Sequence, residues 1–107
     1  MDNDRRKSPR LALKLPVVLT RRNQTAPISS ETEDISITGF YCLTEEPLAP
    51  GEVLECRISL PESNAIMPGS QICLEAEAEV LRVALDHRST AYGCACRIID
   101  YRVQFKQ

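Results

Sequence analysis

The sequence predicts an all-β fold, a small closed antiparallel barrel, from its residue patterns and its length. Six or so short stretches alternate apolar and polar residues with a period of two, which is the pattern of half-buried strands. Turn-forming residues separate them. The 107 residues are enough for one compact domain and too few for two domains that each bury a core. We expect a barrel because closure removes sheet edges that so small a domain could not cover.

The first strand is predicted to begin at Leu11. Residues 1–10 are polar and basic and have no core to join, so they are predicted to form a mobile N-terminal arm ahead of a barrel domain over residues 11–107. From Leu11 to Leu19 every second residue is apolar, which predicts a strand. Pro16 indicates an edge position or a bulge there, because proline cannot donate to a strand ladder.

Three further strands are predicted in the middle of the chain. A polar turn over residues 21–27 precedes an extended segment over residues 28–36, which is rich in β-forming residues. A short strand over residues 40–43 and a proline-containing loop follow. The alternation of Leu54, Cys56, Ile58 and Leu60 with more polar residues then predicts a strand over residues 53–60.

The last third of the chain contains the one ambiguous segment. Residues 72–85 alternate as a strand would, but Leu74, Ala78 and Leu81 also fall at helical spacing. We favour a strand there. A turn over residues 86–90 and a final strand over residues 92–98 follow, and the remaining residues leave room for at most a short C-terminal helix.

Charge and composition narrow the class of protein. The formal net charge is −2, so the whole molecule does not attract nucleic acid or anionic membrane, and any anion site must be local. No apolar run approaches the ~18 residues of a membrane span, and the charged start does not resemble a signal peptide. We therefore expect a cytoplasmic protein without membrane insertion.

The five cysteines are expected to be reduced and structural. Their number is odd and no Cys-x-x-Cys pair occurs, which argues against a disulfide framework and a zinc site. Cys94 and Cys96 alternate as the inward residues of a strand do, so we expect both to be buried.

Two groups of polar residues are predicted to meet at one end of the barrel. Arg5, Arg6 and Arg10 precede the first strand, and the run from Asp34 to Gly39 ends the second. If these strands form a hairpin that turns at residues 23 and 24, paired positions sum to 47, so position 10 lies opposite position 37.

The two groups complement each other as a site for a guanine nucleotide. Arginine forks bind phosphate oxygens and also match the O6 and N7 acceptors of guanine. Asp34 would repel phosphate, but it can accept from the N1–H and N2 donors on the other guanine edge. Ser36 can donate or accept, and Gly39 allows a positive φ or a close backbone approach to a ligand.

These two groups also resemble the motifs of a known family. Arg6-Lys7-Ser8-Pro9-Arg10 matches the Arg-x-x-x-Arg element of PilZ domains, the bacterial receptors for cyclic di-GMP. Asp34-Ile35-Ser36-Ile37-Thr38-Gly39 matches their Asp/Asn-x-Ser-x-x-Gly element, and Tyr92-Gly93 resembles their late glycine. The resemblance covers nearly the whole chain.

The resemblance implies a six-stranded barrel whose arm folds over cyclic di-GMP. Arg6 and Arg10 would contact phosphate and guanine, and Asp34 and Ser36 a guanine edge. Arg5 resembles the residue of family members that bind two intercalated ligand molecules, which leaves one or two molecules per chain open. The family usually continues into a helix after the last strand, whereas this sequence stops at Gln107. We expect the arm to order on binding and to signal to an effector protein.

Three other classes of function compete with this interpretation. A PilZ-like adaptor that binds a protein and no nucleotide is the strongest, because fold does not fix function. Nucleic-acid binding is disfavoured by the low aromatic content, since single strands need stacking platforms. No residue is predicted to be catalytic, because His87 lies in a turn without a partner group. No metal or cofactor is expected, and the face with Glu75, Glu77 and Glu79 is interpreted as a solvated strand.

Overall fold

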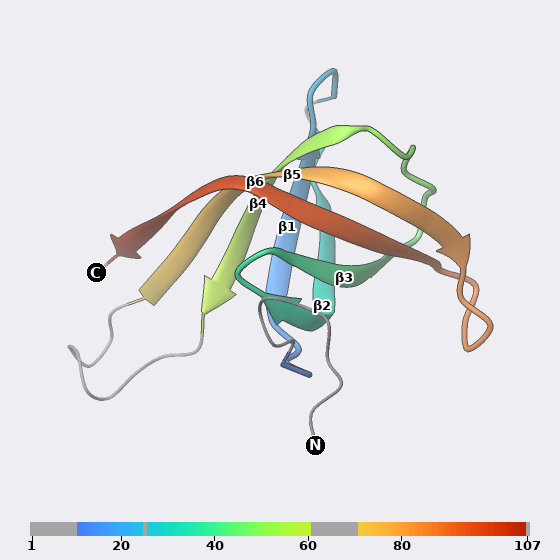
Figure 1. Ribbon diagram of the computed structural model, residues 1–107, viewed down its shortest axis with the longest axis horizontal. Coiled ribbons are helices and arrows are strands. Elements are labelled where there is room, and N and C mark those ends of the chain that lie inside the picture. The colour runs from blue at the N-terminus through green and yellow to red at the C-terminus, as the bar shows by residue number, and fades with distance from the viewer. Residues whose placement is uncertain (1–10, 25, 61–70, 107) are drawn as a thin grey trace.

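The computed structural model describes residues 11–24, 26–60 and 71–106, and they form a closed antiparallel barrel (Figure 1). The strands lie in the order β1-β2-β3-β6-β5-β4, and β1 pairs with β4 to close the barrel. Their bounds are β1 Pro16–Arg21, β2 Ile28–Ser36, β3 Gly39–Thr44, β4 Val53–Leu60, β5 Gln71–Leu85 and β6 Tyr92–Lys106. The predicted barrel is confirmed, and no described segment forms a helix able to cross a membrane.

The alternating residues of the strands fill the barrel interior. Phe40, Leu19 and Leu54 are completely buried, and each fully buried side chain of this kind contributes about 1.5–3 kcal/mol. All five cysteines are buried and free, as predicted for Cys94 and Cys96. Burial raises the pKa of the Cys56 thiol to about 12, so this thiol stays neutral and behaves as an apolar side chain.

The first strand begins later than predicted. The ladder with β2 starts at Pro16 instead of Leu11, although Leu11 makes an isolated bridge to Ile35. The side chain of Thr32 interrupts the pairing, because its Oγ1 accepts from the N–H of Leu15 at 2.9 Å and donates to the Leu13 carbonyl at 2.6 Å. A buried hydroxyl thus replaces one step of the strand ladder.

Residues 71–85 form strand β5, which confirms the strand interpretation of the ambiguous segment. β5 pairs with β4 on one side and with β6 on the other, and two ladders override the helical spacing of its leucines. On its outer face Glu75, Glu77 and Glu79 pair with Arg57, Arg22 and Arg97 at 3.0, 3.0 and 2.7 Å. This face is a row of cross-strand ion pairs.

The last strand is longer than predicted. β6 runs from Tyr92 to Lys106, and its last residues pair with the beginning of β5 from Glu77 back to Gln71. The alternation of Tyr101, Val103 and Phe105 with Arg102 and Gln104 continues the strand pattern in place of the short helix for which the sequence leaves room. Figure 1 shows this half of β6 projecting beyond the β2–β3 hairpin.

Candidate functional site

The hairpin between β2 and β3 holds the acidic half of the predicted site. Asp34 pairs with Tyr41 and Ser36 pairs with Gly39, with residues 37 and 38 as the turn. Ile35 points into the core, so Asp34 and Ser36, one residue to either side, face outward and are half-buried. The structure therefore places these two side chains on the same outer surface of one hairpin.

Ser36 is engaged by its own turn. The N–H of Thr38 donates to Ser36 Oγ at 3.2 Å, and the hydroxyl oxygens of Ser36 and Thr38 lie 3.0 Å apart. A side-chain oxygen that accepts from the backbone two residues later is a common way to fix a tight turn. Ser36 Oγ also lies 3.5 Å from the Gly39 carbonyl oxygen, so its hydroxyl shapes the hairpin through several contacts.

Gly39 is required by the packing of strands and not by an unusual backbone angle. Its φ is not positive, since Gly51 is the one described residue with a positive φ, so that part of the prediction is wrong. A Cβ on Gly39 would overlap the Cys96 carbonyl oxygen of β6. The close approach is therefore between the hairpin and β6, where the Ile98 N–H also donates to the Thr38 carbonyl at 2.8 Å.

The described chain begins directly beside this hairpin. Leu11 and Ile35 exchange two backbone hydrogen bonds of 2.9 Å each. Ile35 lies between Asp34 and Ser36 in the sequence, so the described chain starts opposite the centre of this motif. The paired numbers sum to 46 here and to 47 in the β1–β2 ladder, where Val17 pairs with Ser30. The predicted register is confirmed to within one residue.

The three predicted arginines lie outside the described residues. Arg5, Arg6 and Arg10 all fall within residues 1–10, so the structure does not test their placement. Of the described cations near the hairpin, Lys14 and Arg88 both pair with Glu33, at 2.9 and 3.9 Å. These two cations are thus already engaged by acidic side chains.

Tyr41 is a candidate residue that sequence reasoning missed. It stands opposite Asp34, and its ring lies against Gly93, where a Cβ would overlap the phenol. Burial raises the pKa of Tyr41, the charge of Asp86 raises it further, and Arg88 lowers it. The glycine at position 93 was the available signal, because an aromatic side chain often covers a cross-strand glycine.

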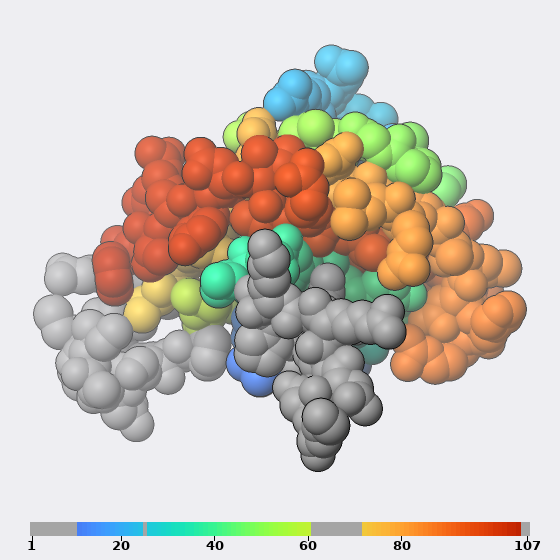
Figure 2. Space-filling model, viewed as in Figure 1, coloured from blue at the N-terminus to red at the C-terminus, as the bar shows by residue number. Residues whose placement is uncertain are grey.

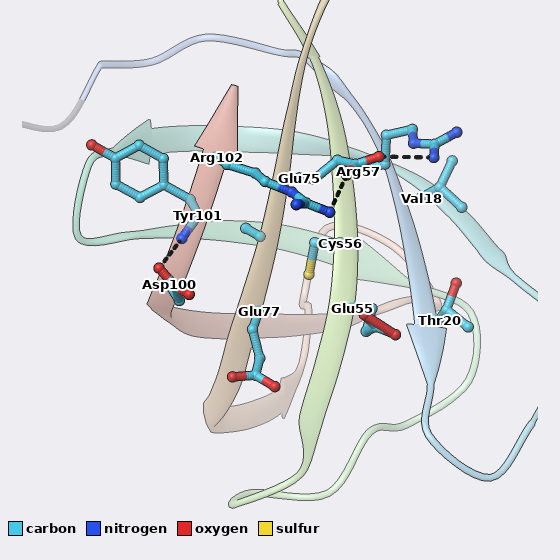
Figure 3. Close-up of a pocket in the computed structure, with 11 residues that line it drawn as sticks. Val18, Thr20, Glu55, Cys56, Arg57, Glu75, Glu77, Asp100, Tyr101 and Arg102 are labelled. Atoms are coloured by element: carbon cyan, nitrogen blue, oxygen red, sulfur yellow. Dashed lines mark hydrogen bonds and ion pairs between the residues drawn. The ribbon is translucent and has the colours of Figure 1, made fainter. Parts of the chain in front are cut away.

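The structure also contains a groove away from this hairpin. This groove, of about 670 Å³, runs over the outer face of β1, β4, β5 and β6 (Figure 3). Its arginines, Arg57 and Arg102, both reach Glu75, at 3.0 and 3.6 Å, and its other charged residues include Glu55 and Asp100. Two arginines that share one carboxylate beside further acidic groups do not suit a phosphate ligand.

Comparisons with known proteins identify this fold. The family model described as the PilZ domain matches residues 4–105, which include both motifs. A structure of the Bacillus subtilis inhibitor of motility MotI/DgrA is similar with a TM-score of 0.76 and 24% identity over 92% of this chain. The PilZ domain of YcgR from Escherichia coli, solved with c-di-GMP, gives a TM-score of 0.60 and 15% identity over 91% of this chain.

The two similar structures differ in how much of them this chain spans. It covers 44% of the MotI/DgrA chain and 79% of the YcgR chain. No curated protein sequence matches it. At these identities the likeness establishes the fold of the barrel.

Proposed function

The chain belongs to the PilZ domain family, and on that premise we propose that it is a receptor for cyclic di-GMP that orders its N-terminal arm on binding. The bound arm signals to an effector protein in the cytoplasm. In this proposal the domain is a ligand-binding adaptor and not an enzyme, so we assign no catalytic residue and no cofactor. Its ligand-binding residues are Arg5, Arg6, Arg10, Asp34, Ser36 and Gly39.

The observation that carries the proposal is the bridge between Leu11 and Ile35. It delivers the residue that follows the Arg-x-x-x-Arg motif to the strand that carries the Asp-x-Ser-x-x-Gly motif. In the proposed complex, Arg10 binds the ligand beside Asp34 and Ser36. A guanidinium and a carboxylate on the two sides of one surface complement the two edges of guanine, and a second guanidinium neutralises phosphate.

The residues of the hairpin divide the work. Asp34 accepts from the guanine N1–H and N2 donors, and the Ser36 hydroxyl adds one contact at the same edge. Gly39 contributes indirectly, because its missing side chain lets the hairpin dock against β6 and so fixes Asp34 and Ser36. Arg5 decides whether a second ligand molecule stacks on the first, so stoichiometry is either one or two.

A second candidate function is a protein-binding adaptor without nucleotide. The specific observation in its favour is that Ser36 and Gly39 both have structural work within the hairpin. The hairpin needs Ser36 and Gly39 for its own structure, so a domain that binds no ligand would also have these two residues. The arginines distinguish the two functions, because the receptor needs them to bind phosphate and guanine and the adaptor does not.

Calorimetric titration with cyclic di-GMP tests the proposal. We expect saturable heat with cyclic di-GMP and none with GTP or cyclic di-AMP, because only the first presents guanine edges on a compact bis-phosphate. Arg6→Ala with Arg10→Ala, and Asp34→Ala alone, should each weaken binding by at least about tenfold. Glu31→Ala is the matched control, because Glu31 is an exposed carboxylate on the same strand and outside the site.

The outcomes separate the two functions. Binding that is lost in the site variants and kept in Glu31→Ala supports the receptor. Folded wild-type protein that gives no heat overturns it and favours the adaptor. A molar ratio near two in the wild type that falls to one in Arg5→Ala assigns the second ligand to Arg5.

A further inference from the structure

The C-terminal half of β6 has a strand neighbour on one side only. β3 pairs with β6 from Tyr92 to Arg97, and the last contact on that side is the Ile98 N–H to the Thr38 carbonyl. Beyond this point β6 pairs with β5, and no other described strand borders it. Figure 1 shows this half of the strand running clear of the hairpin. An unpaired edge of this length is a template for another strand.

The backbone groups at this edge have a defined direction. The pairs Ala78–Ile98 and Glu77–Asp100 leave Ile99 as a bulge, so Tyr101, Val103 and Phe105 direct their N–H and C=O groups away from β5. The N–H of Tyr101 confirms this direction, because it donates to the Asp100 carboxylate at 2.9 Å instead of to a strand. The Asp100 side chain thus occupies one donor of the open edge.

The same three residues expose apolar side chains. Tyr101, Val103 and Phe105 are 51%, 45% and 64% exposed, although they stand opposite residues of β5 that face the core side of the sheet. Figure 3 shows the Tyr101 ring pointing away from the Arg102 side chain, which reaches across to Glu75. In Figure 2 the residues of β6 form a broad continuous part of the surface.

We propose that this edge pairs with the same edge of a second copy of the chain, antiparallel and centred on Val103. In that register paired positions sum to 206, so Val103 faces Val103 of the second copy and Tyr101 faces Phe105. Arg102 faces Gln104, and position 100, an aspartate, faces position 106, a lysine. Aromatic pairs and opposite charges in directly opposed positions are the favourable cross-strand combinations.

Neighbouring registers are less favourable. A two-fold axis at residue 102 places Arg102 against itself, and one at residue 104 places Arg102 against Lys106. An axis at Tyr101 places the end of the second copy opposite Arg97, where Gly39 of β3 already pairs with β6. The register centred on Val103 meets no like charges and leaves the β2–β3 hairpin free. In this register the Tyr101 N–H exchanges the Asp100 carboxylate for the Phe105 carbonyl of the second copy. The proposed pairing is independent of the proposed ligand.

Sedimentation of the 107-residue chain tests this proposal. We expect the mass to rise from 12.0 kDa towards twice that value between about 1 µM and about 1 mM, the range in which weak homodimers form. Val103→Pro removes an N–H that faces the open edge and none that pairs with β5, so the barrel should still fold. The variant should associate at least about tenfold more weakly, because two ladder hydrogen bonds at the axis are lost.

A cysteine at the axis tests the register itself. Val103→Cys should form a disulfide-linked dimer on mild oxidation, because paired residues in this position have Cα atoms about 5.5 Å apart. Gln104→Cys is the control, since its Cα atoms would lie about 7–8 Å apart. The wild type should not cross-link, because its five cysteines are buried. A chain that stays monomeric at the highest concentration, or cross-linking of Gln104→Cys in place of Val103→Cys, overturns the proposal.

Discussion

The residues of the Asp-x-Ser-x-x-Gly motif have different roles in the β2–β3 hairpin. Asp34 stands on the outer surface, Ser36 fixes the turn, and Gly39 permits the contact with β6. The sequence motif alone does not distinguish these roles. The distinction matters for experiments, because loss of binding in a variant of Gly39 would report on folding and loss in a variant of Asp34 would report on the ligand contact.

Replacing Gly39 by alanine should lower the free energy of unfolding by about 2 kcal/mol or more, since the new Cβ meets the Cys96 carbonyl oxygen of a neighbouring strand. Urea denaturation measures the change. Gly51→Ala is the comparison: Gly51 has a φ of 88° and open space around it, so alanine there should cost only about 1 kcal/mol. Equal losses at the two positions would contradict the packing explanation.

At the scale of elements, one ion pair ties the end of β1 to the residue before β4. Arg21 donates from Nε to Glu52 at 2.5 Å and from a terminal nitrogen at 2.9 Å, and both side chains are largely shielded. Glu52 also accepts from the Ala49 N–H at 3.0 Å, so it anchors the preceding loop. The hydrogen bonds from Arg21 hold the pKa of Glu52 below its usual range.

This lowered pKa predicts a pH dependence of stability. Because the folded-state pKa of Glu52 lies below its unfolded value, its contribution is fully present above the unfolded pKa and is lost as pH falls through the folded pKa. Glu52→Gln should lower stability by about 1–2 kcal/mol at neutral pH and by less at low pH. Urea denaturation from neutral to acidic pH measures both. The same loss at every pH would contradict the ion-pair explanation.

The strands and the register of the first hairpin could be predicted from the sequence, because both follow from local alternation and from one turn. Three features could not. The hydroxyl of Thr32 breaks the first strand through a contact 17 residues away, and Tyr41 reaches Gly93 only through the β3–β6 pairing. The end of β6 continues the alternation of a strand, but its pairing with the beginning of β5 is a contact about 30 residues away that alternation alone does not reveal.

At the scale of the whole molecule, the hydrogen bond between Ile98 and Thr38 separates the proposed ligand site from the proposed dimer edge. The Thr38 carbonyl at the hairpin turn accepts from Ile98, and the open edge of β6 begins just after that residue. The site on the β2–β3 hairpin therefore stays accessible in the dimer. Both proposals leave the closed barrel unchanged, because neither needs any of its six ladders to break.

The arm supplies the last prediction, since it is the part of the chain that the proposed mechanism changes. Cyclic di-GMP should slow amide hydrogen exchange in residues 1–10 and in residues 34–39, because the arm closes over a ligand that the hairpin holds. Exchange in β4, on the far side of the closed ladder from β3, should stay the same. Mass spectrometry of peptides with and without ligand measures all three regions, and the variant with Arg6→Ala and Arg10→Ala should show no change in any of them. Protection of the hairpin while the arm exchanges as before would mean that the ligand binds without ordering the arm, and the signal would then have to leave through the barrel.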